Sequence, residues 1–129
     1  MAVRILIVDD SAIFRASLRM MLDFHAGWEV CGEAVDGNEA VQFNRLLSPD
    51  LIIMDLSMPH MTGIEAARET LRDSPKLPIV LLTLDLTTQL AQEARNIGVR
   101  ATLSKTAMQH LAGGIDAALR GEDFSTPIG

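Results

Sequence analysis

Short apolar runs alternate along the chain with amphipathic stretches, and this alternation limits the possible folds more than any other feature. The runs are rich in Val, Ile and Leu, as expected of strands that are buried on both faces. They cover residues 5–8, 28–35, 51–54, 79–82 and 101–104. Strands that alternate with helices indicate βαβ units with right-handed crossovers, and therefore a parallel α/β sheet covered by helices on both faces. The 129 residues fit one domain.

Capping residues and chain breakers delimit the helices expected between these runs. Ser11 can cap a helix that runs to about Phe24, and either Asp36 or Asn38 can cap the next, through about Leu47. The remaining helices are expected over residues 63–72, 87–96 and 108–120. Two consecutive glycines weaken the last of them, because glycine has a low helix propensity.

Two details of the core follow from residue type and spacing. Phe14, Leu18, Met21 and Leu22 recur at helical spacing, which predicts one buried stripe on the first helix. The single cysteine, Cys31, lies in an apolar stretch and has no partner for an internal disulfide. We therefore expect it to be a small buried core residue rather than a reactive thiol.

Charge and hydropathy restrict the classes of partner. Seventeen acidic and eleven basic residues give a formal net charge of −6, which argues against nucleic-acid binding by this segment alone. A DNA-binding domain outside the chain is still compatible with this charge. No apolar run approaches the ~18 residues that a membrane span requires, and the N-terminus lacks the long apolar centre of a signal peptide. The expected location is the cytoplasm, with no membrane contact.

Polar residues follow four of the five predicted strands, where ligands bind in sheets of this kind. Asp9 and Asp10 follow the first strand, Asp55 the third, Thr83 the fourth and Lys105 the fifth. Carboxylates that converge raise one another's pKa, and a divalent cation relieves the repulsion. Magnesium suits such a site because it takes oxygen ligands, commonly one or two carboxylates plus a phosphate.

Among the three acids, Asp55 stands alone at the end of a central strand, which suits a nucleophile that attacks phosphorus. Magnesium and Lys105 would offset the charge that develops on the phosphoryl oxygens, and the Thr83 hydroxyl can donate a hydrogen bond to one of them. Each residue also has an ordinary explanation, as a cap, a turn residue or a solvated surface charge. Their shared position at the strand ends favours the functional interpretation.

The sequence resembles the receiver domain of two-component response regulators from residue 3 to about residue 121. The resemblance rests on Asp9-Asp10 after Ile-Leu-Ile-Val, on the complete segment Asp-Leu-x-Met-Pro-x-x-x-Gly from Asp55 to Gly63, and on Thr83 and Lys105. It implies a flavodoxin-like (CheY-like) doubly wound sheet of five parallel strands, in the order 2-1-3-4-5, with five helices.

The resemblance also implies a role for each site residue. Asp55 would be the phosphoacceptor and, with Asp10 and the backbone carbonyl of Ser57, a ligand of Mg²⁺, which Asp9 would contact through a water. Thr83 and Lys105 would contact the phosphoryl group. The donor would be a phosphohistidine on a sensor histidine kinase or a phosphotransfer protein. The domain would not be an enzyme, beyond magnesium-dependent phosphorylation and dephosphorylation of its own aspartate.

The start of the first helix, Ile13-Phe14-Arg15, and the lack of proline after Lys105 resemble the NarL/FixJ-like subfamily, whose receivers precede a LuxR-type helix-turn-helix. Residues 1–121 would form the receiver, and residues 122–129 a tail that begins the linker to a DNA-binding domain absent from this chain. The implied output is transcription, controlled by altered homodimerisation or domain contacts.

Two positions depart from the family pattern. Thr102 replaces the usual switch aromatic, and Leu84 replaces a residue that is usually small and could partly shield the site. These departures leave open a stand-alone or degenerate receiver that binds partners without being phosphorylated. A phosphatase of the haloacid dehalogenase type also uses a strand-end aspartate with magnesium. That class needs a second aspartate two residues after the nucleophile, where this chain has Ser57.

Overall fold

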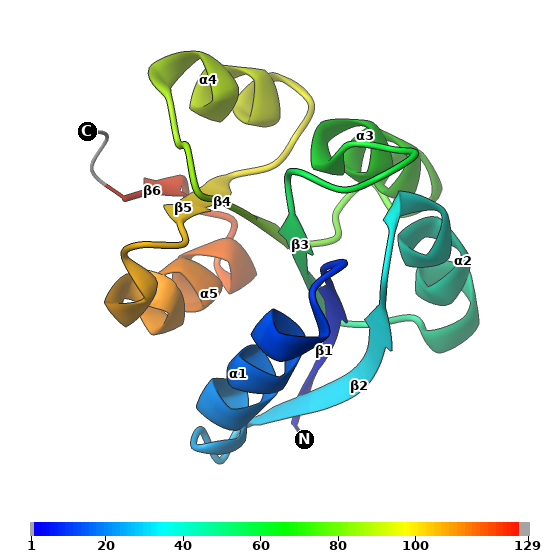
Figure 1. Cartoon of the computed structure of the whole chain (residues 1–129), viewed down its shortest axis with the longest axis vertical. Helices are drawn as coiled ribbons and strands as arrows, with labels where there is room; N and C mark the ends of the chain where they lie inside the picture. The colour runs from blue at the N-terminus through cyan, green and yellow to red at the C-terminus, as the bar shows by residue number, and fades with distance from the viewer. Residues whose placement is uncertain (1, 127–129) are drawn as a thin grey trace.

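A computed structural model describes residues 2–126 of the chain. Within this range the chain forms one parallel sheet with helices on both faces (Figure 1). Its strands are β1 (Val3–Val8), β2 (Trp28–Ala34), β3 (Leu51–Asp55), β4 (Ile79–Thr83), β5 (Ala101–Ser104) and β6 (Phe124–Ser125). The strand order 2-1-3-4-5-6 confirms the predicted order of the first five strands and adds one at the edge.

The helices of the described residues also follow the prediction. They are α1 (Ala12–Asp23), α2 (Gly37–Leu47), α3 (Gly63–Asp73), α4 (Thr88–Asn96) and α5 (Leu111–Leu119). The last begins later than expected, because residues Met108–His110 form a short 3-10 helix and α5 has no side-chain cap. None of the helices in residues 2–126 has the length and apolarity needed to cross a bilayer.

Side-chain caps fix where α1, α2, α3 and α4 begin, and at α4 the cap is the Thr87 hydroxyl, which accepts from the Leu90 N–H at 3.1 Å. Ser11 accepts a hydrogen bond from a backbone N–H in the first turn of α1. Of the two candidates for α2, Asp36 is the cap, since its carboxylate accepts from the N–H of Glu39. Thr62 and Glu65 form a capping box at the start of α3, which fixes the end of the loop that follows β3.

The hydrophobic core has two parts, one on each face of the sheet. Alternate residues of each strand point to opposite faces, so Ile5 and Ile7 lie on one face and Leu6 and Val8 on the other. Helices α1 and α5 cover the first face, and α2, α3 and α4 cover the second (Figure 1). Burial on both faces leaves only the edges and ends of the strands accessible to a ligand.

Two predictions about the core need correction. Leu18 and Leu22 are buried on α1, but Met21 lies at the border of this face and is 41% exposed, so the predicted stripe is narrower. Cys31 is half-buried rather than buried, because β2 is an edge strand. Its side chain packs against the core beneath α2 and α3, and burial raises the pKa of its thiol.

The sixth strand was not foreseen in the polar tail. Phe124 pairs with Ala101 of β5 and lies against the two glycines of α5. Thr126 continues the pairing, since its N–H donates to the Thr102 carbonyl at 3.2 Å and its hydroxyl accepts from the Ser104 N–H at 2.9 Å. These bonds satisfy the outer edge of β5, which would otherwise be unpaired. Residues 127–129 of the predicted linker lie outside the described residues.

Candidate functional site

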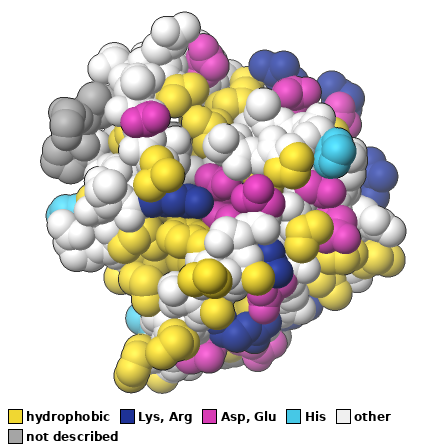
Figure 2. All heavy atoms as spheres, in the orientation of Figure 1, with side chains coloured by type: hydrophobic (Ala, Val, Ile, Leu, Met, Phe, Trp, Pro, Cys, Tyr) yellow, Lys and Arg dark blue, Asp and Glu magenta, His cyan; other side chains and the backbone are white. Residues whose placement is uncertain are grey.

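An open cleft of about 780 Å³ lies at the carboxyl ends of the central strands. The residues singled out in the sequence line it together: Asp9, Asp10, Asp55, Ser57, Thr83, Leu84 and Lys105. Figure 2 shows acidic side chains gathered near the middle of this face, with a basic side chain beside them. The parallel sheet therefore brings into one cleft residues that lie up to 96 positions apart in the sequence.

Backbone hydrogen bonds set the strand ends against one another. Asp55 is the last residue of β3, and the next N–H, of Leu56, donates to the Leu82 carbonyl of β4 at 2.8 Å. The Lys105 N–H donates to the Thr83 carbonyl at 2.8 Å. Because these bonds continue the ladder past the strand ends, the side chains of Asp55, Thr83 and Lys105 project from a rigid rim.

Gly63 allows the loop after Asp55 to fold back closely. Its N–H donates to the Leu56 carbonyl at 2.7 Å. A Cβ atom at this position would lie 2.5 Å from the carbonyl oxygen of Asp55 and 2.7 Å from the Cα of Leu56. Both are backbone atoms that cannot move aside without displacing the strand end, so any larger residue would shift Asp55.

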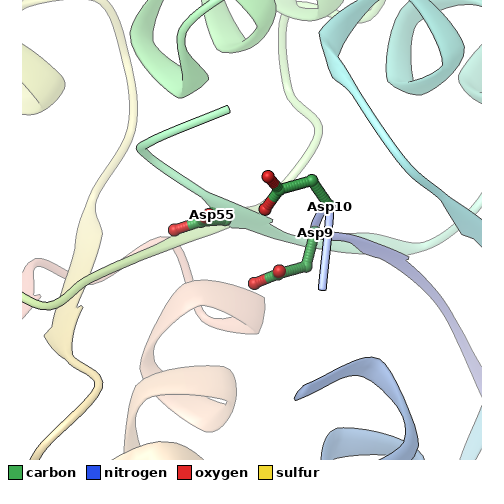
Figure 3. Close-up of side chains that lie close together, drawn as sticks. All are labelled: Asp9, Asp10 and Asp55. Atoms are coloured by element: carbon green, nitrogen blue, oxygen red, sulfur yellow. The ribbon is translucent and has the colours of Figure 1, made fainter. Parts of the chain in front are cut away.

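The three aspartates are close enough to share one ion. Asp9 and Asp10 extend from the end of β1, and Asp55 from the neighbouring end of β3 (Figure 3). Each offers a carboxylate oxygen, and these oxygens all lie within 4.8 Å of one another. Asp9 and Asp55 are buried, whereas Asp10 is exposed at the mouth of the cleft. Three hard oxygen donors with one open side fit a divalent cation such as magnesium.

Lys105 is the basic residue of this cluster. Its Nζ lies 2.8 Å from Oδ2 of Asp9 and 3.2 Å from Oδ1 of Asp55, and its side chain is 12% exposed. The other oxygen of Asp9 accepts from the Ser11 N–H at 2.8 Å. Asp9 is therefore held from two sides, while Asp55 has one oxygen beside the lysine.

The ionised form of Asp55 is disfavoured in this arrangement. Burial and, to a lesser degree, the charge of Asp9 raise its pKa, although Lys105 acts in the opposite direction. Burial opposes the charge on Lys105 as well, but the hydrogen bond and the charges of the two aspartates outweigh it and raise the lysine pKa. A further positive charge would stabilise the fully ionised site, which is the electrostatic requirement of a cation-binding site.

The Thr83 hydroxyl, at the end of β4, is hydrogen-bonded to the loop between β4 and α4. Thr83 is buried, and its Oγ1 accepts from the Asp85 N–H at 3.2 Å. The hydroxyl proton is not used in that bond, so it remains available to an acceptor in the cleft.

Residues 5–114 match the family model described as the response regulator receiver domain. The chain belongs to this family. Among curated relatives, it is 34% identical to the transcriptional regulatory protein YdfI of Bacillus subtilis over 125 residues, 96% of the chain and 58% of YdfI. It is 47% identical over 83 residues to a protein-glutamate methylesterase/protein-glutamine glutaminase of Alkalilimnicola ehrlichii, 64% of the chain and 21% of that protein.

A solved structure extends the likeness over nearly the whole receiver. The LuxR-family two-component response regulator of Aurantimonas sp. SI85-9A1 superposes with a TM-score of 0.94 at 30% identity, covering 98% of this chain and 91% of the other. The curated relatives named above are longer, and the receiver spans a fifth to three fifths of their length. The match to the methylesterase thus involves only part of that enzyme.

The two departures from the receiver pattern occupy different places. Leu84 is 69% exposed and is one of the residues that line the cleft. Thr102 is buried on β5 and borders a cavity of about 10 Å³ together with Thr83 and Leu86. This volume is at the lower limit for a single water, so Leu86 and its neighbours already fill the space beside Thr102.

The sequence did not predict that three further residues support the site: Phe14, Arg15 and Glu33. Phe14 lies under Lys105, with its ring centroid 4.1 Å from Nζ. Arg15 donates from Nη1 to the Asp9 carbonyl at 2.7 Å, and its Nε is 2.9 Å from a carboxylate oxygen of Glu33. A charged residue inside the apolar run of β2 was the available signal for Glu33, because a charge there needs a partner.

Proposed function

We propose that this receiver is a phosphorylation-activated switch, and that Asp55 accepts the phosphoryl group from a phosphohistidine of a sensor histidine kinase or phosphotransfer protein. The observation that carries the proposal is the position of Asp55 at the end of β3. Its carboxylate oxygen lies within 4.8 Å of carboxylate oxygens of Asp9 and Asp10, and its Oδ1 lies 3.2 Å from Nζ of Lys105. A nucleophilic carboxylate, an oxygen-donor cation site and a fixed ammonium group are the parts that phosphoryl transfer needs.

In the transfer, a carboxylate oxygen of Asp55 forms the new bond to phosphorus while the phosphorus–nitrogen bond of the donor breaks. The donor imidazole keeps the electron pair of that bond and takes up a proton. Lys105 would meet one phosphoryl oxygen and the Thr83 hydroxyl would donate to another. Attack of water on phosphorus breaks the phosphorus–oxygen bond to Asp55, releases inorganic phosphate and restores the carboxylate. The domain would therefore act on no substrate other than itself.

Mg²⁺ is the cation we propose for the site, because it prefers carboxylate, carbonyl and phosphate oxygens. Asp10, Asp55 and the backbone carbonyl of Ser57 would bind it directly, and Asp9 through a water. When bound, the ion neutralises charge on the carboxylates and on the transferring phosphoryl group. The open cleft leaves room for both the ion and the incoming donor.

For the output, we propose control of transcription through altered homodimerisation or domain contacts. The names of YdfI and of the LuxR-family regulator from Aurantimonas support this choice. DNA contact would come from a domain outside this chain, since the net charge of −6 does not favour it here. Residues 1–121 would form the receiver and residues 122–129 the beginning of the linker, which starts along the sheet because residues 124–126 pair with β5. The protein would be cytoplasmic.

The test is incubation with acetyl phosphate and MgCl₂, followed by intact-mass measurement. Wild type should gain one phosphoryl group, Asp55→Asn none, and Asp116→Asn, at an exposed position on α5, should gain it like wild type. Chelation of magnesium should abolish the gain. A folded wild-type protein that stays unmodified in both acetyl phosphate and a kinase-coupled assay would contradict the proposal.

Such a result would favour the alternative, a stand-alone or degenerate receiver that binds partners without phosphorylation. The observations on its side are Thr102, which gives β5 no aromatic ring to rotate, and the filled space beside it. On the primary proposal, the switch instead relies on shifts of the loop and helix that follow Thr83. Addition of beryllofluoride should then change the amide spectrum of residues 83–105.

A further inference from the structure

The ring of Phe14 faces the ammonium group of Lys105, with 4.1 Å between Nζ and the ring centroid. Phe14 lies in the first turn of α1, and Lys105 directly follows β5. We propose that Phe14 is a positioning residue, whose π face holds the Lys105 ammonium group beside Asp55. The inference rests on the proposed function for the role of Lys105 and adds a residue outside the cluster at the strand ends.

The surroundings of the pair make the contact strong. The face of an aromatic ring carries partial negative charge, and its attraction for a cation increases as water is excluded. Lys105 is only 12% exposed, and Phe14 is partly buried against the core under α1 and α5. The stem of a lysine is flexible and its ammonium group is strongly hydrated when free, so a ring beneath the ammonium restricts the side chain to orientations that reach the carboxylates.

The ring differs from the other partners of Lys105 in one respect. Asp9 and Asp55 bind the ammonium at 2.8 and 3.2 Å, but their oxygens are also the donors that a cation would take. An aromatic ring offers no ligand to a hard cation and no site to a phosphoryl group. The contact between the ring and Lys105 therefore does not depend on whether the carboxylates bind a cation.

The backbone of Phe14 is held by the turn that follows the two acidic residues. The N–H of Phe14 donates to the Ser11 side chain at 3.2 Å, which caps α1. The Ser11 N–H in turn donates to Asp9. Phe14 is thus linked through Ser11 to the acidic end of β1, and its ring keeps the Lys105 ammonium group close to both aspartates.

The first test is spectroscopic and needs no phosphorylation. The chain contains two lysines, Lys105 and the exposed Lys76, so lysine-selective ¹³C labelling gives two sets of side-chain signals. Protons above a ring face are shielded, so the Hε signals of Lys105 should lie upfield of those of Lys76. In Phe14→Leu the two sets should converge, and in Phe14→Tyr the separation should remain. Coincident signals in wild type would overturn the proposal.

The second test measures phosphorylation by acetyl phosphate in the same proteins. Phe14→Leu should react about fivefold more slowly than wild type, the effect of one cation–π contact, and Phe14→Tyr should restore most of the rate. Phe43→Leu is the matched control, because Phe43 is a partly buried aromatic on the opposite face of the sheet, and it should react like wild type. Equal losses in Phe14→Leu and Phe14→Tyr would assign Phe14 to packing alone and overturn the proposal.

The two tests separate this inference from the proposed function. If wild type shows the shielded Lys105 signals but gains no phosphoryl group, the proposed function fails and the positioning contact stands. If wild type is phosphorylated and Phe14→Leu matches it in rate and in Lys105 shift, the inference fails and the proposed function stands. Thermal unfolding identifies any variant that does not fold. In that case the position of the Lys105 Hε signals in wild type decides whether the ring contact exists.

Discussion

Two carboxylate clusters beside α1 have opposite charge balances. In the cleft, Lys105 pairs with two of the three clustered aspartates, Asp9 and Asp55. On the neighbouring surface, Glu33 of β2 lies between two arginines of α1, 2.9 Å from Arg15 and 2.8 Å from Arg19. The pKa of Asp55 is raised by burial and by Asp9, whereas the pKa of Glu33 is lowered, chiefly by its hydrogen bond to Arg19.

The difference separates a cluster that stabilises the fold from one that is kept at a cost in stability. Ionisation of Glu33 stabilises the folded state, because the carboxylate pairs with Arg15 and Arg19. These ion pairs link β2 to α1. Ionisation of Asp55 destabilises the folded state, unless a bound cation offsets the negative charge. Arg15 connects the two clusters, because it also donates to the Asp9 carbonyl at 2.7 Å. The stable cluster thereby helps to hold the backbone of the acidic loop in place.

Removal of the lysine should have the largest effect on this comparison. Lys105→Met keeps the stem volume but removes the ammonium group that pairs with Asp9 and Asp55, so the free energy of unfolding at pH 7 should fall by about 3 kcal/mol. Urea unfolding at pH 7 and pH 5 measures it, and the loss should be smaller at pH 5, where the carboxyls take up protons more readily. Lys76→Met, at an exposed position, should not change stability. Equal stabilities of the two variants would contradict the assigned role of Lys105.

Magnesium should stabilise the first cluster and leave the second unaffected. At a hundredfold excess over its dissociation constant, a ligand that binds only the folded state adds about 2.7 kcal/mol. Thermal unfolding should therefore shift upward with MgCl₂ compared with NaCl of equal ionic strength. The shift should persist in Glu33→Gln and be lost in Asp10→Asn. An equal shift in the Asp10 variant would place the ion elsewhere.

Neutralisation of Asp55, the proposed phosphoacceptor, should stabilise the protein in the absence of magnesium. Asp55→Asn should raise the free energy of unfolding at pH 7 by roughly 1 kcal/mol, an ordinary size for one substitution. Because the folded pKa of Asp55 lies above the unfolded value, its carboxyl favours the fold below the unfolded pKa. That contribution is lost as pH rises through the folded pKa. The advantage of Asp55→Asn should hence grow with pH over that interval, which chemical denaturation can follow.

The smallest effect is expected at the second cluster, with the opposite dependence on pH. Glu33→Gln should lower stability at pH 7 by at most about 1 kcal/mol, since its ion pairs are partly exposed. The folded pKa of Glu33 lies below the unfolded value, so its contribution is present above the unfolded pKa and is lost as pH falls through the folded one. If unfolding experiments gave both acid variants the same pH trend, the contrast between the clusters would be wrong.

A large part of the fold followed from local patterns. The apolar runs marked β1 to β5 to within a few residues, and the alternation with helices predicted the parallel sheet. The order of its strands came from the resemblance to receiver domains and not from the local pattern. The same pattern placed Asp9, Asp55, Thr83 and Lys105 at strand ends, where the structure brings them into one cleft. Met21 was misplaced because helical spacing shows the direction of a side chain but not how far the sheet extends beneath it.

The sequence by itself determined which segments are buried, where each strand ends and which chemical groups stand there, because these depend on neighbours along the chain. Tertiary structure alone decided that Phe14 lies under Lys105, that Glu33 meets Arg15 and Arg19, and that residues 124–125 pair with β5. Each of these contacts joins elements that are distant in sequence. Their geometry depends on how helices pack on the sheet and on which edge remains unpaired, and neither is encoded in a local period of two or 3.6 residues.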